Sequence, residues 1–186
     1  MDTLDAIQNR RSIKVYADRP ISNEAIEQLL AMAVLAPNHR MTQPWRFYVL
    51  GPEARAGYGR ALGHRKAKRV DDPDAAAQVI DKVEANHRGL PAMLAVSMVI
   101  DENEEIREED YAATYMAIQN LSLAACALGL GTHVKSGAIM DDPRARVAVG
   151  VPEGERIIAT ISLGEPAQVP EAKARQSAKE FTTWVP

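Results

Sequence analysis

The stretch that most constrains the fold is residues 108–131, EEDYAATYMAIQNLSLAACALGLG. Acidic residues precede its apolar part and glycines follow it, which is typical of the start and end of a helix. Between them, apolar residues lie on all sides, and many are alanines or other small residues. A helix that is apolar all round is buried all round. In a chain of 186 residues, one way to bury it fully is against a second subunit, so the pattern indicates dimerisation.

Helices and strands alternate along the rest of the chain. Apolar spacing, caps and prolines predict helices at 3–10, 22–36, 53–63, 73–88 and 141–150, the second of them ended by Pro37. Extended segments are predicted at 43–51, 92–100, 132–137 and 155–164. The run 92–100 is almost wholly apolar, as expected in a sheet covered on both faces. We therefore expect one domain, residues 1–186, of α+β or mixed α/β type, with a proline-containing tail wrapped over its surface or a neighbour.

Charge and cysteine content limit the function classes. The net charge of −3 and the pI near 5.8 argue against a nucleic-acid or anionic-membrane binder, because there is no global positive field. Cys126 is the only cysteine, so an intrachain disulfide is excluded. The four histidines show no metal-ligand spacing, and we expect no metal. The N-terminus lacks signal-peptide features and no apolar run is long enough to span a membrane, so we expect a cytoplasmic protein.

The basic stretch NRRSIKVY, residues 9–16, is a candidate anion site. If residues 10–14 are extended, alternation puts Arg10, Ser12 and Lys14 on one face and Arg11 and Ile13 on the other. An arginine fork, a lysine charge and a serine hydroxyl together form a suitable clamp for a phosphate. A solvated basic turn explains the spacing equally well, and the residues alone leave both interpretations open.

Two further polar segments are candidates for ligand contact. The loop APNHRMTQPWRF, residues 36–47, connects a helix to a strand, and His39, Arg40 and Gln43 could hydrogen-bond a polar heteroaromatic edge. The stretch GLGTHVKSG, residues 129–137, is not a dinucleotide fingerprint, because Val134 occupies the third glycine position and a helix precedes it. Lys135 and Ser136 could add a cation and a hydroxyl to an anion site; by itself the segment is better explained as a surface strand.

Motifs for protein-based catalysis are missing. The chain has no H-E-x-x-H, G-x-S-x-G or Walker A motif, and no nucleophile stands beside an evident base. It offers groups to hold a phosphate but none arranged for acid–base or covalent chemistry. Such a pattern favours a protein whose cofactor carries the reaction.

The chain resembles the nitroreductase family of FMN enzymes, particularly its short single-domain members. The resemblance rests on NRRSIKVY, APNHRMTQPWRF, ALGLGTHVKSG and ISLGEP in that order, and it spans almost the whole chain. It implies an α+β fold with a central, mostly antiparallel sheet flanked by helices. It also implies an intertwined homodimer with two FMN molecules at the subunit interface, and ping-pong reduction of nitroaromatics, quinones or related acceptors by NADH or NADPH.

The resemblance also implies cofactor-binding residues and no catalytic side chain, since the flavin itself handles the hydride. Arg10 and Ser12 would bind the FMN phosphate or ribityl chain, with Arg11 in the same motif, and Lys14 would contact the flavin. Asn38 and His39 would reach the flavin of the other subunit, and Gln43 the polar edge of the ring. Backbone at Val134, with Lys135 and Ser136, would complete the phosphate site; short members often have an aromatic residue and an arginine at positions 134 and 135.

Three alternatives remain open at this level. A family member of this kind could fragment the flavin or dehalogenate a substrate. It could also be a flavin-binding or storage protein that NADH and NADPH do not reduce. Without the resemblance, residues 10–14 could belong to a basic interaction module with no cofactor. The role of residues 55–90 is not assigned by any pattern.

Overall fold

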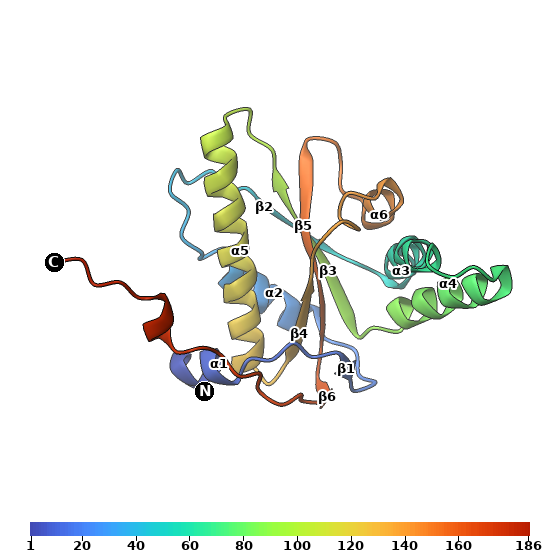
Figure 1. Cartoon of the computed structure of the whole chain (residues 1–186), viewed down its shortest axis with the longest axis horizontal. Helices are drawn as coiled ribbons and strands as arrows, with labels where there is room; N and C mark the ends of the chain where they lie inside the picture. Colours follow the sequence, from blue (N-terminus) through green and yellow to red (C-terminus); the bar gives the residue numbers. More distant parts are fainter.

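The computed structural model describes residues 1–186 and shows an α+β fold (Figure 1). The helices are α1 (Thr3–Asn9), α2 (Asn23–Ala33), α3 (Pro52–Ala67), α4 (Pro73–Arg88), α5 (Glu104–Ala127), α6 (Pro143–Val149) and the short 3-10 helix η1 (Ala178–Phe181). The strands are β1 (Val15–Tyr16), β2 (Trp45–Val49), β3 (Ala92–Val99), β4 (Gly131–Lys135), β5 (Glu155–Gly164) and β6 (Pro166–Gln168). The predicted order of helices and long strands is confirmed.

Four strands form a central sheet in the order β2-β3-β5-β4, with every neighbouring pair antiparallel. This confirms the expected mostly antiparallel sheet. A second, two-stranded sheet pairs β1 with β6, with Val15 opposite Gln168. The small sheet ties the segment after α1 to the start of the C-terminal tail.

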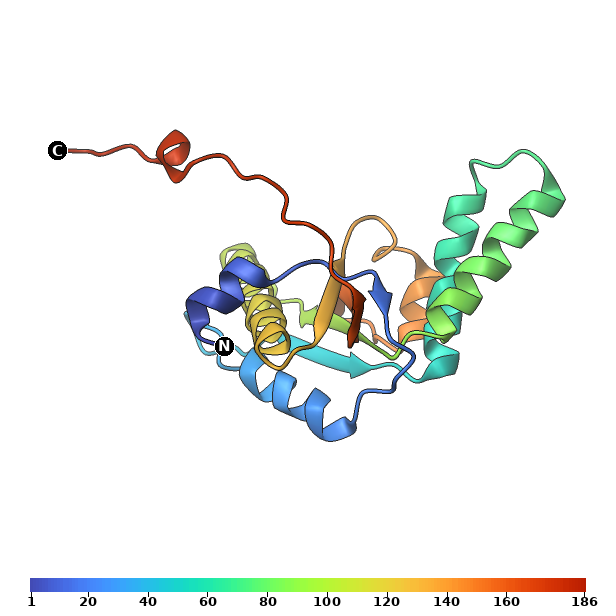
Figure 2. The same cartoon turned by 90° about the horizontal axis from the view of Figure 1, so that it is seen from below.

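Helices cover both faces of the central sheet (Figure 2). On one face, α2 and α5 bury side chains against alternate residues of β3, including Leu94 and Val96. On the other face, α3 and α6 pack against Met93 and Ala95, and α4 stacks on α3. Seven of the eight residues of β3 are buried, so the prediction of a strand covered on both sides is confirmed.

The long helix α5 is stabilised at its start and left partly uncovered along its length. Asn103 caps its first turn and Glu104 and Glu105 lie at the positive end of the helix dipole. Burial all round does not hold within one chain, because Tyr111 and Met116 stay 37% and 39% exposed. Helix α2 is shorter than predicted: it ends at Ala33 rather than near Pro37.

The C-terminal tail leaves the body of the molecule. After β6, residues 169–186 are exposed throughout, and Figure 2 shows this segment running outward from the sheet. Phe181 and Trp184 are 73% and 90% exposed. The tail runs past the N-terminal segment as far as Arg175, but its end does not pack on its own chain, which leaves a neighbour as the remaining expectation for that end. No helix is long and apolar enough to cross a bilayer.

Candidate cofactor site

Residues 10–14 lie along the edge strand of the central sheet. Helix α1 ends at Asn9, Ser12 bridges Thr132 of β4 in parallel, and the Ile13 amide donates to the Thr132 carbonyl at 2.9 Å. Ile13 is 3% exposed, so its side chain anchors the segment in the core. This anchoring explains why the neighbouring polar side chains are left at the surface of the sheet edge.

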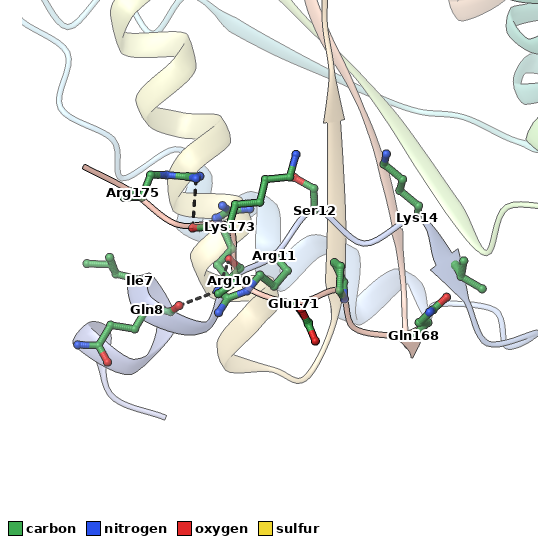
Figure 3. Close-up of a pocket in the computed structure, with 13 residues that line it drawn as sticks. Ile7, Gln8, Arg10, Arg11, Ser12, Lys14, Gln168, Glu171, Lys173 and Arg175 are labelled. Carbon is green, nitrogen blue, oxygen red and sulfur yellow. Dashed lines mark hydrogen bonds between the residues drawn. The ribbon is translucent and has the colours of Figure 1, made fainter. Parts of the chain in front are cut away.

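The basic residues of this segment line a cavity of about 740 Å³ (Figure 3). Arg11 departs from the predicted alternation, because it lines the cavity as Arg10, Ser12 and Lys14 do. One nitrogen of its guanidinium donates to the carbonyls of Gln8 and Arg10, at 2.6 and 3.0 Å. The other guanidinium donors of Arg11 stay free for a ligand.

Two residues that the sequence analysis missed complete this cavity. Lys173 and Arg175, in the C-terminal tail, line it together with Arg10, Arg11 and Lys14. Five cationic side chains thus surround the cavity, against one carboxylate, that of Glu171. In Figure 3, Ser12, Lys14 and Lys173 point to the same side while Glu171 points away from them. The sequence does contain a signal for these two residues: Lys and Arg two positions apart in an extended tail have their side chains on the same face, where both can contact one anion.

Lys135 lies near this cavity but does not line it. Its ammonium is 3.4 Å from Nε2 of His87 on α4. Burial lowers the pKa of Lys135, and the positive charges of Lys66 and Lys14 lower it further. Lys14 lines the cavity, so the charge of a cavity residue acts on Lys135. Val134 packs against the apolar core on the α5 face of the sheet.

Ser136 lies beside Tyr115 of α5. The pKa of Tyr115 is raised overall, mainly by burial, and a hydrogen bond with Ser136 partly offsets this rise. None of residues 134–136 lines the cavity of Figure 3. The structure brings Arg10, Arg11, Ser12 and Lys14 together at the cavity. Residues 134–136 lie outside it. The binding role of each of these residues stays a prediction.

The loop between α2 and β2 is held by the N-terminal half of α5. His39 Nδ1 is 2.9 Å from Glu109, and the Arg40 guanidinium donates to Glu109 and Glu105 at 3.0 and 3.2 Å. The carboxamide of Asn38 accepts from the Gln43 amide at 2.7 Å. Gln43 has a φ of +46°, in the left-handed region. These contacts fix the loop within its own chain.

The loop and the basic cavity lie at opposite ends of α5 (Figure 1). The loop contacts Asp110, whereas Met1, next to α1, contacts Cys126 with 3.9 Å between the two sulfur atoms. These two α5 residues are about 24 Å apart along the helix axis. A single chain therefore does not bring Asn38, His39 and Gln43 to the cavity.

Asp110 should be the residue on which the loop geometry depends. It is 3% exposed, and it accepts hydrogen bonds from the Thr42 hydroxyl and, at 3.5 Å, from Asn38. Asp110→Ala leaves both donors without this partner, so we expect the free energy of unfolding in urea to fall by about 1–3 kcal/mol. Glu108→Ala, at an exposed position of the same helix, is the control. Equal stability of the two variants would contradict the assignment.

Comparisons with known proteins agree over most of the chain. The model of the Nitroreductase family matches residues 7–165. A Bacillus subtilis protein named "Putative NAD(P)H nitroreductase YfhC" is 36% identical over 180 residues, covering 96% of this chain and 92% of that protein.

Two solved structures share the fold. The "Nitroreductase-like Family Protein" from Bacillus cereus has a TM-score of 0.87 and 28% identity, covering 100% of this chain and 96% of that one. A Desulfovibrio desulfuricans protein, described as "a putative nitroreductase in complex with fmn", has a TM-score of 0.76 and 27% identity. The match covers 100% of this chain and 98% of that one.

Proposed function

Because the chain belongs to the nitroreductase family, we propose that it is an FMN-dependent NAD(P)H oxidoreductase acting on nitroaromatics, quinones or related electron-poor acceptors. The reaction is ping-pong: the reductant leaves before the acceptor binds. When bound, FMN supplies the hydride-accepting and electron-donating chemistry. A cytoplasmic location belongs to the same proposal, since NADH and NADPH are available there.

The observation that carries the proposal is the convergence of cations in the cavity of Figure 3. Arg10 and Arg11 come from the N-terminal segment, and Lys173 and Arg175 from the tail. A phosphate monoester carries up to two negative charges and accepts several hydrogen bonds, for which arginine forks and a serine hydroxyl are suited. The cavity therefore fits the phosphate end of FMN. In this proposal Ser12 donates to the same phosphate or to the ribityl chain.

Lys14 and Lys135 extend the cationic character from the phosphate end along the sheet edge. In this proposal Lys14 contacts the flavin ring, while Lys135 and Ser136, with the backbone at Val134, complete the phosphate site. No residue of the chain is required as a nucleophile or general base. The protein's part is to bind the cofactor, orient it and leave one face of the ring open to two successive substrates.

A homodimer completes the site in this proposal. Asn38, His39 and Gln43 lie at the end of α5 far from the cavity of their own chain, and in this proposal the fixed loop presents them to the FMN held by a partner. Apolar side chains left exposed on α1, α2, the turn after α2, α5 and the tail supply a surface for such a partner: Leu4, Ile7, Met32, Leu35, Met116, Phe181 and Trp184. Covering them would also complete the burial that the composition of α5 demands.

The visible spectrum of the purified protein, recorded before and after anaerobic addition of NADPH or NADH, tests the proposal. We expect an oxidised flavin spectrum that bleaches with the reductant and returns when a quinone or nitroaromatic is added. Initial rates at several acceptor concentrations should give parallel double-reciprocal lines. A bound flavin that neither nucleotide bleaches would instead support a binding or storage protein. If no flavin binds even with added FMN, the proposal is wrong.

A further inference from the structure

The hairpin of α3 and α4 carries a buried imidazole to the edge of the proposed cofactor site. His87, in the last turn of α4, is 6% exposed. Its Nδ1 is 2.7 Å from the carbonyl oxygen of Val83. Because a carbonyl oxygen only accepts hydrogen bonds, Nδ1 must carry the hydrogen. In the neutral ring, Nε2 then has a free lone pair, and this atom faces the ammonium of Lys135 at 3.4 Å.

Close packing fixes the imidazole in this orientation. A Cβ atom added at Gly59 of α3 would lie 2.8 Å from His87 Cβ, so the two helices approach this closely only because residue 59 has no side chain. The ring also packs against Tyr58, with 5.6 Å between the ring centroids. The Thr160 hydroxyl of β5 is 3.2 Å from the Tyr58 hydroxyl. His87 is thus held on two sides.

The electrostatic surroundings keep this imidazole neutral and make it useful as an acceptor. Burial lowers the pKa of His87 to about 4, and the charges of Lys135 and Lys66 act in the same direction. The positive charges of Lys66 and Lys14 in turn act on Lys135 and lower its pKa. None of these three lysines forms an ion pair. Without a neutral acceptor, mutual repulsion would drive the Lys135 ammonium away from Lys14.

We propose that His87 is a positioning residue, whose Nε2 accepts a hydrogen bond from Lys135 and holds its ammonium beside Lys14 at the end of the cofactor cavity. The inference rests on the proposed function for the identity of the ligand, FMN, and on the structure alone for the contact. It gives residues 55–90 a role: the α3–α4 hairpin positions a cation that β4 contributes to the site.

A double-mutant cycle on FMN affinity tests the proposal. His87→Leu removes the acceptor, and we expect it to weaken FMN binding by about tenfold. His87→Gln retains an acceptor oxygen and should stay within about threefold of the wild type. In a Lys135→Met background, neither change should weaken FMN binding further. A His87→Leu penalty of the same size in both backgrounds would show a purely structural role and overturn the proposal.

Histidine NMR of the flavin-free protein supplies a readout that does not depend on FMN. We expect the Nδ1–H tautomer for His87, and a higher His87 pKa in Lys135→Met, because a repelling charge has been removed. An Nε2–H tautomer, or titration unchanged by Lys135→Met, would overturn the contact. If the wild type binds no FMN, the proposed function fails, and these two signals still decide whether Lys135 and His87 interact.

Discussion

Replacing both Lys173 and Arg175 with alanine is expected to weaken FMN binding by about a hundredfold and to leave riboflavin binding unchanged. Both residues line the cationic cavity, and both lie in an exposed tail. Truncating their side chains therefore removes no contact of the hydrophobic core. Charge-assisted hydrogen bonds to a phosphate are lost with the two side chains. Riboflavin lacks the phosphate but has the same ring and ribityl chain. Titration of the flavin-free protein with each flavin, followed by fluorescence, separates the two parts of the ligand.

A second double variant controls for the change in overall charge. Lys179→Ala with Arg69→Ala removes the same number of positive charges from two sites that do not line the cavity. It should bind FMN as the wild type does at about 0.15 M salt, where charges beyond the Debye length are screened. An equal loss of affinity in the control would mean that a general field, not local contact, attracts the phosphate. A parallel loss of riboflavin affinity would mean that Lys173 and Arg175 contact the ring or ribityl chain.

Local patterns were sufficient for the main elements because their signals lie within short windows. The predicted helix at 73–88 coincides with α4, and the apolar run at 92–100 coincides with β3 to within one residue. Proline is favoured in the first turn of a helix, which explains Pro73 at the start of α4. A strand covered on both faces is apolar at successive positions, which explains the sequence of β3. The end of α2 was placed wrongly: the helix ends at Ala33, and the amides of Leu35 and Ala36 instead donate to the carbonyls of Met32 and Ala33, three residues back.

The parts of the site that were missed depend on contacts between distant segments. Lys173 and Arg175 approach Arg10 because β6 pairs with β1, a ladder of few residues that joins the two ends of the chain. His87 meets Lys135 only because the end of α4 and the end of β4, which are far apart in the sequence, approach each other in the fold. The loop at Asn38 and His39 was assigned to ligand contact from its place between a helix and a strand and from the family resemblance. In the structure His39 of this loop contacts Glu109 on α5. Opposite charges in the sequence could suggest such a contact, but they do not show which basic residue meets which acidic one.

Gly131→Ala is expected to displace the whole basic segment from the sheet edge. A Cβ atom at position 131 would lie 2.4 Å from Cγ1 of Ile13 and 2.7 Å from its Cβ. Because the Ile13 Cβ is fixed to the backbone, no rotamer change relieves the second contact. Residues 10–14 must then move off β4, against the anchoring of the buried Ile13 side chain. We expect the free energy of unfolding to fall by about 1–3 kcal/mol.

The same displacement should reduce FMN affinity by about tenfold or more, because Arg10, Ser12 and Lys14 move with the backbone. Gly89→Ala is the matched control: its nearest neighbour beyond the adjacent residues is the Ala85 carbonyl oxygen at 3.5 Å, an ordinary contact. Its stability should stay within about 0.5 kcal/mol of the wild type, and its FMN affinity should not change. If Gly131→Ala loses stability but binds FMN normally, residues 10–14 do not bind the cofactor. If it loses neither, the sheet edge absorbs the added methyl group, and the cavity does not depend on this close approach.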